Sequence, residues 1–211
     1  PDAEFSKETD RFSAGALFYL EILQYFFNME REILPYDPLY DFGFLIDEEA
    51  GKFETYEEYK RLKETFIKEY IYEMMRLNAD VTPFRTLEHI AGVHYVAMTV
   101  GRGLWEAGVP IDLALTSGAA AGHDLGKFGC KPNERVPYLH YYYTNQWFNN
   151  HSMEYTGHIA ANHSTWDLEP ENLSVESLVL IYSDFRVKQS RGEDGREITY
   201  ISSLDEAFNV I

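Results

Sequence analysis

Two helix-forming runs separated by a tight turn constrain the fold more than any other part of this sequence. The pattern predicts a helix over residues 86–107 and a second helix over residues 110–123. Gly108-Val109-Pro110 forms the turn between them, and Pro110 falls in the first helical turn, where its missing N–H is tolerated. The sequence therefore predicts two antiparallel helices that pack side by side.

The rest of the chain also shows mainly helical patterns. Apolar residues recur at helical spacing, and the loops between them are rich in Gly, Pro or charged residues. The predicted helices cover residues 13–34, 55–78, 138–149, a segment ending near His163, and 174–188, followed by a charged loop (188–197) and a truncated final helix. A short hairpin is expected within 42–55. We therefore predict an all-α fold, with an N-terminal helical extension (1–82) and a helical domain (83–211).

Charge and composition exclude some classes of function. The chain carries 35 acidic and 18 basic residues, a formal net charge of −17, which argues against binding of a nucleic-acid polymer. Small phosphate esters stay possible, because bound cations reverse the local field. The single cysteine, Cys130, predicts a reducing compartment. No apolar run is long enough to suggest a membrane span, so we expect a cytoplasmic protein without a membrane partner.

Histidines stand on both predicted helices of the helical hairpin. His94 lies fourteen residues before Gly108, and His123 lies thirteen residues after Pro110. If both helices rise equally per residue, these two positions reach similar heights and their imidazoles can share one ion. The small residues Gly118 and Gly122 would let the two helix backbones approach closely. Taken alone, however, the pair His123-Asp124 is more often a surface hydrogen bond or a loop cap.

Asp184 interrupts an almost continuously apolar helix, and its carboxylate therefore needs a cation, an arginine or a metal ion. Arg186 is two residues away and points to another side of the helix. A single metal ion would satisfy Asp184 together with His94, His123 and Asp124. Mixed imidazole and carboxylate ligands suit Mn, Fe, Co, Ni or Zn better than Ca.

Three stretches resemble the landmarks of the HD-domain metal-dependent phosphohydrolases. They are HYVAMTV at 94–100, AAAGHDLGKFG at 119–129 and IYSDFRVK at 181–188. The separations of 29 and 60 residues between the His, the His-Asp pair and the last Asp are similar to that family. The resemblance covers roughly residues 84–190. It implies an all-α fold in which one metal ion is held by His94, His123, Asp124 and Asp184.

Many members of that family carry two further histidines, which hold a second metal ion. The resemblance favours His163 for one of them, because HSTWD is similar to a stretch of the HD-GYP subgroup. For its partner we favour His140, which opens the tyrosine-rich helix, over His151, which falls in a predicted loop. The GYP stretch itself is absent, with LEPEN at 168–172 in its place, so a cyclic dinucleotide is only one possible substrate.

Two other histidines are predicted to lie outside the site. His158 precedes His163 by five residues, and His89 precedes His94 by five residues. Five residues rotate a helix to a different face, so neither should share an ion with its neighbour. We therefore expect His89 to be a surface or core residue.

The leading hypothesis is hydrolysis of a phosphate mono- or diester, such as that of a nucleotide, by one or two divalent transition-metal ions. Asp124 would bridge two ions, and Lys127 would hold a phosphate oxygen as a point charge. Several aromatic residues could stack a base, although such residues are more often core or rim: Tyr138, Tyr141, Tyr142, Tyr143, Trp147 and Trp166. One alternative is a di-iron oxygenase acting on a small polyol or phosphonate, and another is a non-catalytic regulatory domain.

Overall fold

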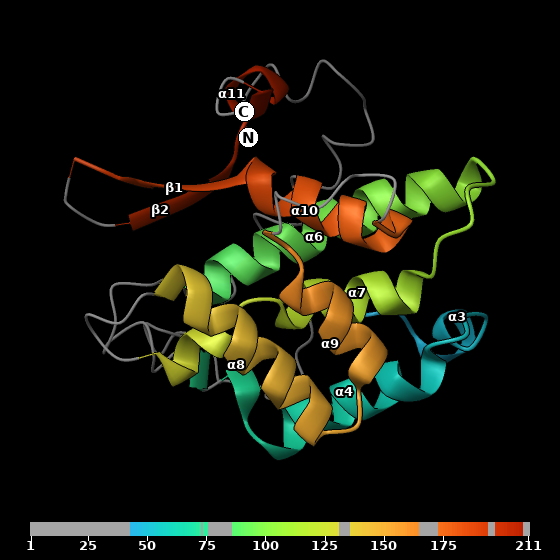
Figure 1. The fold of residues 1–211 in the computed structure, drawn as a ribbon. Helices are drawn as coiled ribbons and strands as arrows, with labels where there is room; N and C mark the ends of the chain where they lie inside the picture. Colours follow the sequence, from blue (N-terminus) through green and yellow to red (C-terminus); the bar gives the residue numbers. More distant parts are fainter. Residues whose placement is uncertain are drawn as a thin grey trace, which may run out of the picture.

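The computed structural model describes residues 43–72, 74–75, 86–130, 136–164, 173–193 and 197–208. These residues are mostly helical and include one two-stranded sheet, so the helical class is confirmed in this coarse form (Figure 1). The helix predicted over 13–34 lies outside the described residues. The elements are α3 (Asp47–Ala50), α4 (Tyr56–Lys68), α6 (Thr86–Glu106), α7 (Leu113–Gly122), the 3₁₀ helix η1 (Leu125–Gly129), α8 (Val136–Asn150), α9 (Glu154–Ala161), α10 (Val175–Arg186), β1 (Val187–Arg191), β2 (Glu197–Ile201) and α11 (Leu204–Phe208).

The helical hairpin α6–α7 is present, but its second helix begins later than predicted. Asp112 caps α7, since its Oδ1 accepts a hydrogen bond from the Leu115 N–H at 2.8 Å. The non-helical residues 109–112 lead back beside α6 to Gly101, where an added Cβ would lie 3.1 Å from Leu113 Cδ2. An extended residue advances about 3.3 Å and a helical one about 1.5 Å, so this short segment shifts the register of α7 by several residues.

Helix α7 is the central element of the fold, and all but one of its residues are buried. Gly118 and Gly122 of α7 were predicted to face α6, but they face other helices. A Cβ added to Gly118 would lie 3.1 Å from Thr156 of α9 and 3.2 Å from Leu62 of α4. A Cβ added to Gly122 would lie 2.5 Å from the Phe148 ring of α8. The glycines therefore let α4, α8 and α9 pack closely around α7.

The described part of the N-terminal extension shares the hydrophobic core of the helical domain. Tyr59, Leu62 and Phe66 of α4 are each at most 1% exposed and belong to the same buried cluster as α6 and α7. The helix predicted over 55–78 is interrupted after α4 by a turn, in which Tyr70 has a φ of 53°. The hairpin predicted within 42–55 is wrong for its described residues, which form α3 and turns.

A β-hairpin follows α10 directly, where a charged loop was predicted. Strands β1 and β2 pair antiparallel from Val187↔Ile201 to Arg191↔Glu197, and they project from the helical body beside the end of α10 (Figure 1). Ser202 closes the base of this β-hairpin, because its N–H and its hydroxyl both donate to the carbonyl of Arg186. The alternation in β2 of Ile, Thr, Tyr and Ile favours a strand, a signal that the charges of the segment obscured.

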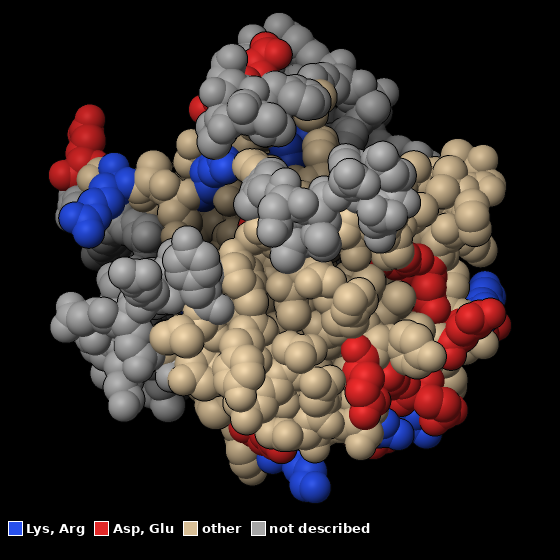
Figure 2. Space-filling view, in the orientation of Figure 1, with Lys and Arg blue, Asp and Glu red and all other residues tan. Residues whose placement is uncertain are grey.

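Charged side chains are unevenly distributed over the surface. Acidic side chains gather over the part of the molecule that carries α3 and α4, whereas the face over α8 and α9 is almost free of charge (Figure 2). Helix α8 contains no Lys, Arg, Asp or Glu at all. Among the described residues, no helix is both long and apolar enough to cross a membrane.

Candidate metal centre

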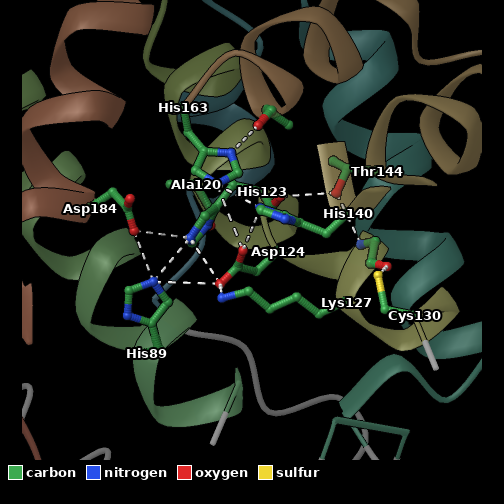
Figure 3. Close-up of polar contacts among 12 residues, drawn as sticks. His89, Ala120, His123, Asp124, Lys127, Cys130, His140, Thr144, His163 and Asp184 are labelled. Atoms are coloured by element: carbon green, nitrogen blue, oxygen red, sulfur yellow. Dashed lines mark hydrogen bonds and ion pairs between the residues drawn. The ribbon is translucent and has the colours of Figure 1, made fainter. Parts of the chain in front are cut away.

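Six histidine and aspartate side chains from five segments of the chain converge at one end of α7 (Figure 3). They are His89 from α6, His123 and Asp124 after α7, His140 from α8, His163 after α9, and Asp184 from α10. Five of the six metal ligands predicted from the sequence are therefore brought together. The exception is His94, whose predicted place is taken by His89.

The first group of ligands surrounds one oxygen of Asp124. His89 Nε2 lies 2.9 Å from Asp184 Oδ1, 3.4 Å from His123 Nε2 and 3.5 Å from Asp124 Oδ2. His123 Nε2 lies 3.7 Å from Asp124 Oδ2 and 3.7 Å from Asp184 Oδ1. Two imidazole nitrogens and two carboxylate oxygens thus face a common centre. His89, His123 and Asp124 could hold a divalent metal ion, and Asp184 lies beside the two imidazoles of this group.

The second group surrounds the other oxygen of Asp124. His140 Nε2 and His163 Nε2 are 3.4 Å apart, and they lie 3.6 Å and 3.7 Å from Asp124 Oδ1. Within the described part of the chain, this buried oxygen has no hydrogen-bond partner. A buried carboxylate oxygen without a partner is unfavourable unless a cation is next to it. The second group could therefore also hold a metal ion.

Hydrogen bonds to the backbone fix two of the imidazole rings in the form that binds metal. His123 Nδ1 donates to the Ala120 carbonyl at 2.8 Å, and His163 Nδ1 donates to the Ala160 carbonyl at 2.7 Å. A carbonyl only accepts, so Nδ1 carries the proton and the lone pair of Nε2 points into the cluster. Burial lowers the pKa of His123 to about 3, so this ring is neutral at ordinary pH.

The charged side chains of the cluster stabilise one another. Burial opposes ionisation of Asp124, but Lys127 and the surrounding histidines outweigh it and hold its pKa well below the usual range. Lys127 Nζ lies 2.5 Å from Asp124 Oδ2, and this carboxylate raises the pKa of the lysine despite burial. Asp184 likewise has a lowered pKa, because its hydrogen bond to His89 outweighs burial. Both carboxylates are therefore ionised and ready to bind a cation.

A glycine allows η1 to bring Lys127 to the cluster. A Cβ on Gly126 would lie 1.9 Å from the His140 carbonyl oxygen, a contact that no side chain tolerates. The Gly126 N–H donates to Thr144 Oγ1 at 2.9 Å, and that hydroxyl donates to the His123 carbonyl at 3.0 Å. Thr144 thus ties η1 and the His-Asp pair to α8.

His94 lies elsewhere in the core, which corrects the sequence prediction. Its Nε2 is 2.8 Å from Ser117 Oγ, which in turn is 3.0 Å from the Tyr59 hydroxyl. Its ring makes an edge contact with Phe44 at a centroid distance of 5.4 Å, and burial lowers its pKa to about 3. The shifted register of α7 is the cause, because Ser117, six residues before His123, is level with His94.

The sequence did contain a signal for His89. Asp112 is a favoured N-cap, which places the start of α7 at residue 113 and leaves 109–112 to advance as non-helical chain. Counted with that longer advance, His123 becomes level with His89 rather than with His94. His89 was excluded because it lies five residues before His94 and therefore on another face of the helix. Since His94 is not part of the cluster, that argument does not apply to His89.

The remaining histidines are outside the cluster, as predicted for His158. His158 is exposed, and its Nε2 lies 3.3 Å from the Asn162 side-chain amide. His151 contacts Glu69 on the surface, with Nε2 2.8 Å from Oε1. The preference for His140 over His151 therefore agrees with the geometry.

Six aromatic residues were considered for stacking a base, although a role in the core or rim is more frequent. Among those whose side chains are described, only Tyr141 is next to the cluster. Its ring centroid lies 3.9 Å from that of His140. Tyr143 and Trp147 instead line a cavity of about 300 Å³ that is bordered by none of the six ligand residues. Tyr142 is 61% exposed. The side chains of Tyr138 and Trp166 lie outside the described set.

No protein-family model, no curated protein and no solved structure matches this chain. The resemblance to the HD-domain phosphohydrolases therefore stays a prediction. What the geometry provides by itself is a buried cluster of histidines and aspartates that could hold metal ions, arranged in two groups that share Asp124.

Proposed function

We propose that this chain is a metal-dependent phosphohydrolase of the HD type, which hydrolyses a small phosphate mono- or diester such as a nucleotide. The observation that supports this proposal most is the position of Asp124. Its Oδ2 faces one group of ligands and its Oδ1 faces the other. A carboxylate shared in this way suits a pair of neighbouring divalent ions, an arrangement used for displacement at phosphorus.

The residues divide between two metal positions. His89, His123 and Asp184 would hold one ion together with Asp124 Oδ2, and His140 and His163 would hold the other together with Asp124 Oδ1. When bound, the ions supply a water of lowered pKa and positive charge beside the phosphoryl group. Mixed nitrogen and oxygen ligands favour Mn, Fe, Co, Ni or Zn.

The exposure of the side chains defines where a substrate would enter. His123 and Asp124 are at most 1% exposed, whereas the side chains of Asp184 and Lys127 are 22% and 21% exposed. The open side of the cluster therefore carries Lys127. Its ammonium group would hold a non-bridging phosphate oxygen as a point charge and orient the ester toward the ligands.

The test is elemental analysis of protein purified without chelator, followed by assays of phosphomonoesters and phosphodiesters with added Mn²⁺ or Fe²⁺. We expect two ions per chain and phosphate release in the wild type. Asp124→Ala should lose both ions and the activity. His158→Ala, a histidine variant outside the cluster, should keep them. Metal content that is unchanged in Asp124→Ala would reject the metal centre.

An oxygen electrode distinguishes the main alternative. An HD-fold di-iron oxygenase would use the same ligand types on a small polyol or phosphonate. Iron-dependent oxygen consumption, without release of phosphate from any ester, would therefore reject the phosphohydrolase and keep the metal centre. A protein that binds two ions but catalyses neither reaction would favour a regulatory domain.

A further inference from the structure

The two proposed metal positions are not equally supported by protein ligands. The first group comprises four side chains, and two of them, His89 and Asp184, already contact each other at 2.9 Å. Among the residues that the structure describes, the second group has only His140 and His163 besides the shared Asp124. These two histidines come from different segments, α8 and the turn after α9. The second position therefore depends on whatever holds those two rings together.

Tyr141 touches both of these rings. Its ring centroid lies 3.9 Å from that of His140, with an interplanar angle of 45°, and 4.9 Å from that of His163, with an angle of 66°. The two histidine centroids are themselves 5.3 Å apart. The three rings thus form a closed triangle of aromatic contacts, each at or below the distances typical of tilted and edge-on pairs.

The hydroxyl of Tyr141 lies next to the same turn. Burial raises its pKa, and the side chain of Ser164, the residue that follows His163, lowers it. The His163 ring also makes an edge contact with His123 at 4.8 Å. His140 and His163 contact each other directly, with Nε2 atoms 3.4 Å apart, and Tyr141 packs against both rings beside that contact.

We propose that Tyr141 is a positioning residue that sets the spacing of His140 and His163, and thereby determines whether the second metal position is occupied. The inference rests on the proposed metal centre and deepens it, because the described ring contacts of Tyr141 are with His140 and His163, the two ligands that belong only to the second position. A rigid aromatic side chain suits this role, since its flat faces and edges fix the orientation of two neighbouring rings. Loss of the ring would remove one packing contact from each of the two histidines, which would widen the range of orientations that their rings adopt.

Metal titration tests this inference without any assay of activity. Protein stripped with chelator is titrated with Mn²⁺, and bound metal is followed by calorimetry and by electron paramagnetic resonance, in which two neighbouring Mn²⁺ ions give a spin-coupled signal. For the wild type we expect two equivalents and the coupled signal. For Tyr141→Leu we expect a first equivalent of unchanged affinity and a second that binds about 10- to 100-fold more weakly, the range for loss of a group that orients a ligand.

Two further variants separate the ring from other effects. Tyr141→Phe keeps the ring and loses the hydroxyl, and it should bind both ions as the wild type does. Tyr142→Leu is the matched control, because Tyr142 is the next residue of α8 and 61% exposed. It should also bind both ions.

Several results would overturn the positioning role of Tyr141. These are wild-type affinity for both ions in Tyr141→Leu, equal weakening of both ions, a Tyr141→Phe variant as defective as Tyr141→Leu, or a wild type that binds only one ion. Failure of the proposed hydrolase is distinguishable from these. A wild type that binds two ions and releases no phosphate would reject the hydrolase and leave the positioning role intact.

Discussion

Two buried histidines of this protein, His94 and His123, have similar surroundings but different partners. Burial lowers the pKa of each to about 3, so both are neutral. Around His94, hydrogen bonds connect Ser117 and Tyr59, and the Tyr59 hydroxyl also accepts the Leu45 N–H at 2.8 Å. Beside His123, in contrast, the Oδ1 atom of Asp124 has no hydrogen-bond partner among the described residues.

The comparison teaches that burial and a lowered pKa do not identify a metal ligand. They describe a histidine in the core and a histidine in a candidate metal centre equally well. What separates the two regions is hydrogen bonding, because the His94 network has partners supplied by the protein and the cluster leaves Asp124 Oδ1 for a ligand. Four predictions test this distinction, beginning with the largest expected effect.

Replacing each of two α6 histidines should separate the regions most clearly. His89→Ala should weaken Mn²⁺ binding by at least about 100-fold, since loss of a direct ligand exceeds the effect of losing an outer partner. His94→Ala should bind Mn²⁺ as the wild type does. Competition with a chromophoric chelator measures both affinities. Equal weakening in the two variants would contradict the assignment of His89 in place of His94.

Bound metal should stabilise the fold through the cluster alone. At a free Mn²⁺ concentration of 100 times the dissociation constant, the free energy of unfolding should rise by about 2.7 kcal/mol for each occupied site. Urea unfolding with Mn²⁺ and with chelator gives this difference. Ser117→Ala should show the same rise as the wild type, whereas His89→Ala should lose part of it. A smaller rise in Ser117→Ala would mean that the two regions are coupled.

Within the His94 network, removal of one hydroxyl should destabilise the fold. Ser117→Ala leaves His94 Nε2 and the Tyr59 hydroxyl without their shared partner, so the free energy of unfolding should fall by about 1–3 kcal/mol. The measurement is urea unfolding in chelator. Ser183→Ala is the control, since the one hydrogen bond of this buried hydroxyl to a described residue is to the Val179 carbonyl of its own helix, and it should lose less. An equal loss would show that the network adds nothing specific.

The pH dependence of stability should be smaller without His94. Its folded pKa of about 3 lies below the ordinary 6.5, so between these values the unfolded chain binds more protons and stability falls as pH falls. The slope is about 1.4 kcal/mol per pH unit for each such histidine. In chelator, His94→Gln should lose about this much of the slope between pH 6 and pH 4. An unchanged slope would mean that His94 is protonated in the folded protein.

Much of the fold could be predicted from local pattern, because α6, α8 and α10 follow apolar periodicity and their ends agree with the structure within a few residues. The β-hairpin after α10 was missed, since its charges suggested a loop although Ile198 and Tyr200 favour a strand. The start of α7 was also misjudged, and that error displaced the histidine assignment.

Site residues were predictable where they are adjacent in the sequence or where a charged residue interrupts an apolar helix. His123 and Asp124 are neighbours in the sequence, and Asp184 is conspicuous as a carboxylate in an apolar helix. His89 was not predictable from the number of residues alone, because the level at which two antiparallel helices face each other depends on the conformation of the connection between them. It required the start of α7 to be placed after the N-cap Asp112. Tyr141 carried no distinguishing signal among the consecutive tyrosines of α8.

The backbone bonds of His123 and His163 have an electrostatic consequence. Ala120 and Ala160 lie in the last turns of α7 and α9, where carbonyl groups lack helical partners and carry the negative end of the helix dipole. Two such negative poles therefore point at the cluster, in addition to two ionised carboxylates. This field attracts a cation and repels a free anion. We expect ordered association, in which inorganic phosphate binds only after the metal has reversed the sign of the local potential.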